Sequence, residues 1–226
     1  VNSQGLIEDM QTLSGELVSN GNFSQIGPEQ IENGDFATDS DWTKAAGWTI
    51  SGGTANATSA TSGSPLSQYV DVGKTYKITY DVVSLSQGAF QVDLSFSGTA
   101  LGQLVTTTGT FTDFITSINP ALSIRAVGTT TGSITNVSAK EVGQDWSVTG
   151  SDANNYVEFN GSTARLKFLN TSPVTQLVSS FVMTAGKKYK LTVDVLTVTS
   201  GGIKIDGNGI SETFNTPGIT TRIINP

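Results

Sequence analysis

Polar side chains alternate with apolar ones along two neighbouring segments, and this spacing places several hydrogen-bonding groups on one face where they could contact a ligand. In GKTYKITYDV, Lys77 and Asp81 share one face of an extended chain with Thr79. Gln91 and Asp93 alternate in the same way in the segment that follows. Carboxylate, amide and ammonium groups hydrogen-bond readily to sugar hydroxyls. The face therefore either contacts a glycan or is solvated, and solvation is the more common role of a polar sheet face.

Aromatic rings complete a ligand site when they lie beside such polar groups, and two rings outside these strands are candidates. Trp42 lies in the polar stretch TDSDWTK, so we expect its ring to be exposed, and Tyr69 precedes the long strand. Trp48 and Trp146 occupy matched positions in GWTISG and DWSVTG, and we expect both in the core. The candidate glycan contacts are Trp42, Tyr69, Lys77, Asp81, Gln91 and Asp93.

Catalysis has weaker candidates than binding. Asp81 and Asp93 offer the two carboxylates of a glycosidase, but both recur as Asp194 and Asp206 on a flat polar face. A cross-strand ion pair with Lys77 is a simpler role for such a carboxylate. The sequence has no cysteine and no histidine, which excludes Ser-His-Asp and Cys-His nucleophiles and most zinc, copper and iron sites. We therefore expect a protein that is not an enzyme.

The net charge and the composition limit the classes of partner that the protein can bind. The 226 residues carry a net charge of −7, which disfavours binding to nucleic acid and to anionic membrane surfaces. No apolar run approaches the roughly 20 residues of a membrane span. Only 14% of the residues are charged, whereas disordered chains are usually rich in charge. An ordered all-β protein fits this composition.

In the expected strands that position these side chains, apolar residues recur at every second position. The expected core face consists of Tyr76, Ile78, Tyr80 and Val82, with Phe90, Val92, Leu94 and Phe96 from the next strand. Turn-forming residues separate further short strands, a spacing typical of a β-sandwich. Residues 6–13 have helical spacing over two turns at most, and we expect a short helix or an extended segment there.

An internal repeat predicts the domain organisation. GKTYKITYDV at 73–82 matches GKKYKLTVDV at 186–195, an offset of 186 − 73 = 113 residues, and Ile118-Asn119-Pro120 matches Ile224-Asn225-Pro226. We predict an N-terminal attachment segment (1–29) and two tandem β-sandwich modules (30–142 and 143–226). The second module lacks about two C-terminal strands, which we expect to follow Pro226 or, less favoured, to come from a partner.

The combined pattern resembles a known group of modules. Its parts are N-G-D-F, a Trp, G-W-[ST]-[IV]-[ST]-G, V-x-x-G-K-x-Y-K-[IL]-T-x-D-V and the closing strand ITNVSAKEV. Together they resemble the carbohydrate-binding-module-like jelly rolls, of the family four and nine type, found in tail and fibre proteins of marine phages. The resemblance covers residues 30–142 well and 143–226 in part.

The resemblance implies a structural or adhesive virion protein, such as a phage fibre, neck or capsid-decoration subunit. Its partners would be other virion proteins, further copies of the chain in a trimer, and a cell-surface glycan. A structural calcium near Asp35 and Asn136 is also implied, although related modules place a carboxylate where Asn136 stands. The alternative is a true carbohydrate-binding module of a secreted glycan-active enzyme, or a bacterial surface adhesin, in which case the protein is secreted or at the cell surface.

Overall fold

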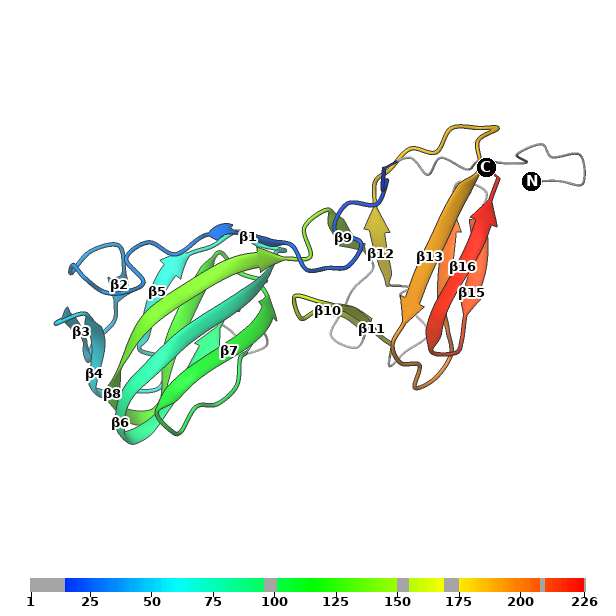
Figure 1. The fold of residues 1–226 in the computed structure, drawn as a ribbon. Coiled ribbons are helices and arrows are strands. Elements are labelled where there is room, and N and C mark those ends of the chain that lie inside the picture. Colours follow the sequence, from blue (N-terminus) through cyan, green and yellow to red (C-terminus); the bar gives the residue numbers. More distant parts are fainter. Residues whose placement is uncertain (1–14, 96–100, 150–154, 169–174, 208–209, 226) are drawn as a thin grey trace, which may run out of the picture. The chain divides into compact units, whose positions relative to one another are not determined.

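The computed structural model describes residues 15–95, 101–149, 155–168, 175–207 and 210–225. These residues form sixteen strands and no helix (Figure 1), so the expected all-β fold is confirmed. The segment 6–13, where a helix or extended segment was expected, lies outside the described residues. None of the described residues belongs to a helix that could cross a membrane. The chain divides into two compact units, residues 19–179 and residues 180–226 together with 1–18.

The first eight strands form one hydrogen-bonded sheet within the unit 19–179. They are β1 (Ile26–Glu29), β2 (Thr43–Lys44), β3 (Trp48–Ser51), β4 (Thr54–Ala60), β5 (Pro65–Tyr69), β6 (Thr75–Asp93), β7 (Gly109–Thr116) and β8 (Ala121–Val142). Strand β8 is the hub, because it pairs antiparallel with β1, β4, β5 and β6. Residues 26–29, expected in the attachment segment, are therefore part of this sheet.

Strands β6 and β8 are long and curved, with 19 and 22 residues (Figure 1). Their pairing shifts register four times between Thr79 and Ala89, which is how bulges bend a ladder. Gly88 lies in this region with φ 75°, and a Cβ there would come within 2.5 Å of the Thr129 carbonyl oxygen. Because the ladder bends here, both halves of β6 contribute side chains to one core.

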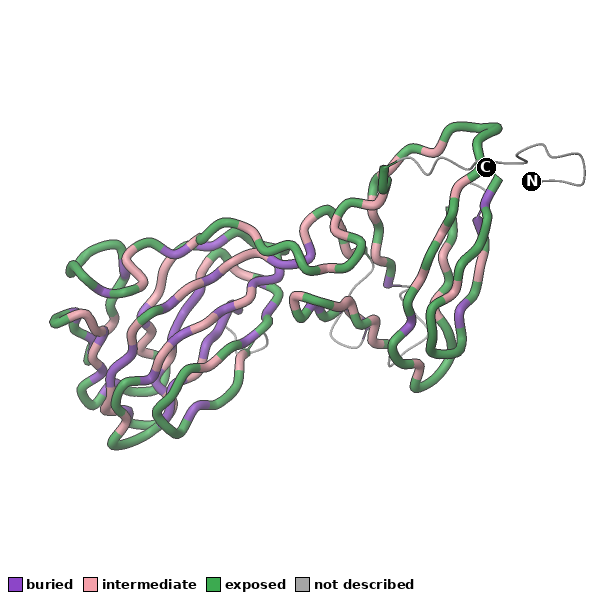
Figure 2. Tube along the Cα trace, in the orientation of Figure 1, coloured by how far each residue is buried: buried purple, intermediate pink, exposed green. Residues whose placement is uncertain are grey.

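The core follows the alternation that the sequence predicts (Figure 2). All the expected core residues of β6 and its continuation that the structure describes are buried: Tyr76, Ile78, Tyr80, Val82, Phe90, Val92 and Leu94. Phe96 lies outside the described residues. Burial of one such side chain stabilises the fold by about 1.5–3 kcal/mol. The same burial raises the pKa of Tyr76 to about 12, because the charged phenolate loses its hydration.

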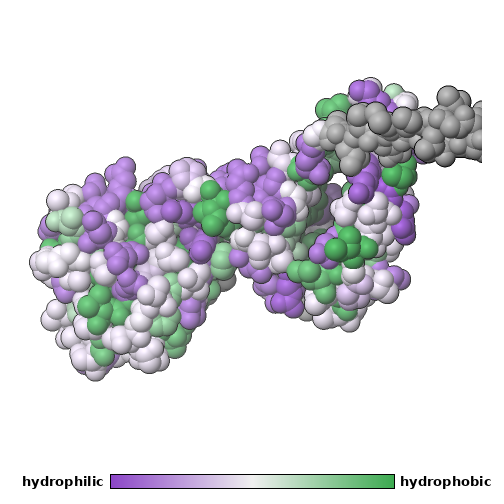
Figure 3. Space-filling model, in the orientation of Figure 1, coloured by the Kyte–Doolittle hydropathy of each residue, from purple (hydrophilic) through white to green (hydrophobic). Residues whose placement is uncertain are grey.

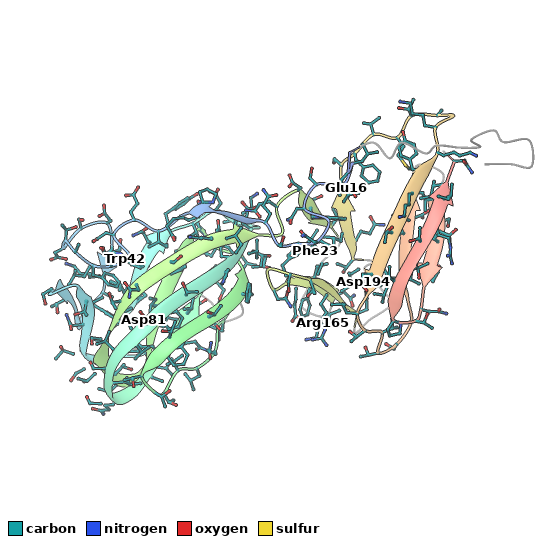
Figure 4. The ribbon with its side chains drawn as sticks, in the orientation of Figure 1. Glu16, Phe23, Trp42, Asp81, Arg165 and Asp194 are labelled. Carbon is teal, nitrogen blue, oxygen red and sulfur yellow. The ribbon has the colours of Figure 1, made fainter. Side chains whose placement is uncertain are left out.

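Four further strands complete the unit 19–179: β9 (Trp146–Thr149), β10 (Asn155–Phe159), β11 (Ala164–Phe168) and β12 (Gln176–Ser179). β9 pairs with β12, and β10 pairs with β11. Their apolar side chains form a second, smaller cluster around Val142, Val157 and Phe159. Phe23 packs against this cluster from a position far earlier in the chain (Figure 4).

The described residues of the unit that contains 180–226 form two antiparallel strand pairs. β13 (Tyr189–Val195) pairs with β16 (Gly218–Ile224), and β14 (Ile203–Gly207) pairs with β15 (Ile210–Phe214). The β14–β15 pair is a hairpin and lies between β13 and β16 in the sequence. Tyr189 lies opposite Ile224 just as Tyr76 lies opposite Ile115 in the β6–β7 pair. Ile224 therefore corresponds to Ile115, and the predicted match of Ile224-Asn225-Pro226 to Ile118-Asn119-Pro120 is wrong.

The hub strand has no counterpart among the described residues of 146–225. Each of the eight strands β9–β16 has one partner strand, and each pair forms a separate two-stranded sheet. β6, in contrast, is paired with β7 on one side and with β8 on the other. The core residues reflect this difference, since Ile78 is fully buried whereas its repeat partner Leu191 is only half-buried.

Candidate ligand-binding face

The outer face of β6, between β7 and β8, carries the polar residues singled out above. Lys77 lies opposite Phe114 of β7 and opposite Lys140 of β8. The next outward residue of β6, Thr79, lies opposite Thr112 and Ser138. Polar side chains from three strands therefore form rows across this face, and the expectation that Lys77 lies on the solvent side of β6 is confirmed.

A shallow depression of about 350 Å³ opens on this face where β1 crosses beside β8. It is lined by Ile26, Gly27, Lys77, Thr79, Ser138 and Lys140. Two lysines and two hydroxyl-bearing residues thus line one small volume together with the apolar Ile26. Ligand sites usually combine apolar surface with a few convergent polar groups, and this depression has that composition.

The two lysines of the depression have no ion pair among the described residues. The predicted pairing of Lys77 with a cross-strand carboxylate is wrong, because its partners across the sheet are Phe114 and Lys140. The neighbouring acid Glu141 is paired with Lys74 at 2.8 Å. Two like charges directly opposite each other repel across a sheet, so the Lys77–Lys140 pair taken by itself is unfavourable.

Glu29 of β1 lies opposite Lys140 but is used by other donors. Its Oε1 accepts hydrogen bonds from the backbone N–H groups of Ala139 at 2.8 Å and of Gln30 and Ile31 at 3.1 Å. Its Oε2 accepts from Ser138 Oγ at 2.5 Å. This carboxylate fixes β1 on β8 through four neutral donors, and no ion pair joins it to Lys140 among the described residues.

Asp81 lies further along β6, on the same outer face (Figure 4). Its carboxylate accepts hydrogen bonds from Thr110 Oγ1 at 2.6 Å and from Asn136 Nδ2 at 2.7 Å. The hydrogen bond from Thr110, followed by that from Asn136, lowers the pKa of Asp81 because each favours the ionised form. Asp81 is therefore an anchored carboxylate that joins β6, β7 and β8.

Asp93 is not on the exposed face with Asp81. Its side chain is only 1% exposed, and it accepts hydrogen bonds from the N–H and hydroxyl of Ser95 and from Arg125 Nη1 at 2.7 Å. Gln91 beside it donates to the Gly102 carbonyl at 3.0 Å. Asp81 lies opposite Thr135 and Asp93 opposite Ser123, twelve residues apart on β8 (135 − 123), so the fold does not bring them together as a glycosidase pair.

Trp42 lies in the core, and the prediction that its ring is exposed is wrong. It is 7% exposed, it packs on Phe36 with ring centroids 5.2 Å apart, and its Nε1 donates to the Asn33 carbonyl at 3.1 Å. Tyr69 is 69% exposed at the end of β5. Trp48 is buried as expected, with its Nε1 bound to the Ser64 carbonyl.

The turn Asn20–Phe23 has the same N-G-x-F pattern as Asn33–Phe36, and it repeats the arrangement around Trp42. Phe23 and Trp146 have ring centroids 5.2 Å apart, and Trp146 Nε1 donates to the Asn20 carbonyl at 3.0 Å. Asn20 Nδ2 in turn donates to the Gln144 carbonyl. Trp146 therefore corresponds to Trp42, and the predicted match with Trp48 is wrong. Residues that precede the first predicted module pack against residues that follow it.

The turn around Asp35 does lie beside the closing strand, because Val137 N–H donates to the Gly34 carbonyl at 2.9 Å. Hydrogen-bond donors occupy this point. Thr135 Oγ1 donates to the Gly53 carbonyl at 2.9 Å, and Asn136 Nδ2 donates to Asp81. Both side chains therefore already hydrogen-bond within the protein. Within the described ranges, no three Asp, Glu, His or Cys residues are grouped as metal ligands.

Three residues of this face escaped the sequence reasoning: Lys140, Ser138 and Phe114. Alternation in β7 offered a signal, since Phe111 and Ile115 share the face opposite to that of Phe114. No comparable signal revealed Lys140, because its proximity to Lys77 depends on pairing across 63 residues (140 − 77). Comparison with known proteins does not add to this picture, as neither a protein family nor a curated protein sequence matches the chain.

Proposed function

We propose that this chain is a non-enzymatic structural and adhesive protein of a virion. In this proposal it is a phage fibre, neck or capsid-decoration subunit whose β-sandwiches act as spacers and contact host glycans. The observation that supports it is the common register of two strand pairs, β6–β7 and β13–β16, in which Tyr76–Ile115 and Tyr189–Ile224 are equivalent. Repetition of one β-unit along a chain extends the molecule and repeats its surface, which suits a spacer.

The proposal specifies partners and place. The partners are other virion proteins and copies of the same chain, with a trimer as the favoured assembly. The net charge of −7 disfavours nucleic acid as a partner. The location is the extracellular particle, with a secreted or cell-surface location as the alternative.

Light scattering on the full-length protein tests the structural part of the proposal. A trimer, or another closed oligomer, is the expected result. A monomer at every accessible concentration would contradict a role as a fibre subunit, because such subunits function as assemblies.

A second candidate is a glycan-binding module of a secreted glycan-active enzyme or of a bacterial adhesin. The depression beside Lys77 favours it, because the depression combines donors with an apolar edge. A glycan array probed with the folded protein tests this reading, with Lys77→Ala as the reporting variant. Trp42→Ala is unsuitable as a reporter, because Trp42 is buried. A folded protein that binds no glycan on the array would remove this candidate.

A further inference from the structure

The depression between β1, β6 and β8 concentrates positive charge on a chain whose net charge is −7. Residues 30–142 contain five cations, and three of them have an acidic partner: Lys44 with Asp39, Lys74 with Glu141, and Arg125 with Asp93. Lys77 and Lys140 are the two without a partner among the described residues, and they lie directly opposite each other. Cross-strand neighbours of this kind have Cβ atoms about 5 Å apart, so one small anion can reach both ammonium groups.

The hydrogen-bonding groups in the depression are mainly donors. Each lysine has three N–H donors and no acceptor. Thr79 adds a hydroxyl that has no hydrogen-bond partner among the described residues, whereas the hydroxyl of Ser138 is already donated to Glu29. An oxyanion with several acceptor oxygens matches this set, whereas a neutral sugar hydroxyl would satisfy it less completely.

Apolar surface flanks the donors. Ile26 lines the depression and is 45% exposed, and Phe114 extends the row beyond Lys77 and is 37% exposed. A bare inorganic anion would leave these surfaces in water, whereas the C–H faces of a sugar ring could cover them. The surface of this unit is otherwise mainly hydrophilic or neutral in the view of Figure 3, with apolar patches scattered across it.

We propose that this depression binds the anionic group of an acidic glycan, either the carboxylate of a uronic acid or a sulfate ester. Lys77 and Lys140 hold the oxyanion, Thr79 donates a further hydrogen bond, and Ile26 and Phe114 contact the sugar ring. The inference rests on the proposed adhesive function and adds the chemical class of the ligand. It also gives a role to two like charges whose proximity is unfavourable by itself.

Isothermal titration of the full chain with three oligosaccharides of equal length tests the inference. The probes are a carrageenan oligosaccharide, which carries sulfate esters and no carboxylate, an oligogalacturonate, which carries carboxylates and no sulfate, and a neutral cello-oligosaccharide. Lys77→Met and Lys140→Met remove one charge each and keep the apolar stem. Lys190→Met is the matched control, because Lys190 is the repeat partner of Lys77 (190 − 77 = 113) and lies opposite Ile223 rather than a second lysine.

We expect binding of at least one acidic probe, and the sulfated and uronate probes distinguish the two anions. Each variant in the depression should lose affinity about tenfold or more, the loss of a charge-assisted hydrogen bond, while Lys190→Met binds like the wild type. Equal losses in all three variants would show diffuse charge attraction and overturn the site. Neutral-probe binding that both variants in the depression retain would overturn the ligand class and leave the adhesive function standing. Absence of all binding in a protein that forms oligomers would overturn the inference and leave the structural role.

Discussion

Replacement of Trp42 by alanine tests whether this ring stabilises the core or contacts a ligand. The indole is 7% exposed, packs against Phe36 with the two rings tilted by 46°, and donates a hydrogen bond to the Asn33 carbonyl. A buried aromatic removes roughly 200 Å² from water, worth about 5 kcal/mol at 25 cal/mol/Å². Residual burial in the unfolded chain reduces this to about 3–4 kcal/mol, and the hydrogen bond adds about 1 kcal/mol. We therefore expect Trp42→Ala to lower the free energy of unfolding by about 4 kcal/mol.

Urea unfolding followed by far-ultraviolet circular dichroism measures this loss, with each transition fitted separately because the chain has two compact units. Two variants calibrate the result. Trp146→Ala removes a ring of the same geometry that is only half-buried, so we expect about half the loss. Tyr69→Ala removes an exposed ring and should cost less than about 0.5 kcal/mol. A loss below about 1 kcal/mol for Trp42→Ala would refute the core assignment.

Three further predictions concern charges and strand edges. Arg125→Met should destabilise the protein by about 3 kcal/mol in urea unfolding, because it leaves the buried Asp93 carboxylate without its cation; a neutral effect would contradict this. Thr110→Val should raise the pKa of Asp81 toward 3.8 in a carbon-detected NMR titration, because it removes the hydrogen bond that contributes most to lowering this pKa. The lowered pKa stabilises the folded protein at pH values above the pKa of Asp81 in the unfolded chain, and this stability is lost as the pH falls through the pKa in the folded state. An unchanged titration would show that the hydrogen bond is unimportant. Hydrogen exchange should protect alternate amides of β13 but nearly all amides of β6 from 75 to 82, because β13 is paired on one side only; equal protection would contradict the open edge.

Local alternation allowed the sequence to predict which side of each strand faces the core. Tyr76, Ile78 and Tyr80 are buried and Lys77 points outward, as a period of two requires. This information is contained within one strand, so no knowledge of the neighbours is needed. The all-β class followed from the same pattern, repeated between turn-forming residues.

Contacts between distant segments could not be predicted in the same way. The polar surroundings of Trp42 suggested exposure, but its burial depends on Phe36 and on the turn that holds it. Asp93 looked like a surface carboxylate, and its burial depends on Arg125, which lies 32 residues later. The depression depends on Lys140 lying opposite Lys77. In each case the decisive partner is set by strand pairing, which a single sequence does not specify.

The proposed adhesive function requires that the outer face of β1, β6 and β8 contacts a glycan. Backbone chemical-shift mapping by NMR during titration with an acidic oligosaccharide tests that claim. We expect the largest shifts on Lys77, Thr79, Ser138 and Lys140, with smaller ones on Ile26. Shifts centred on Tyr69, or on strands that do not border the depression, would contradict it.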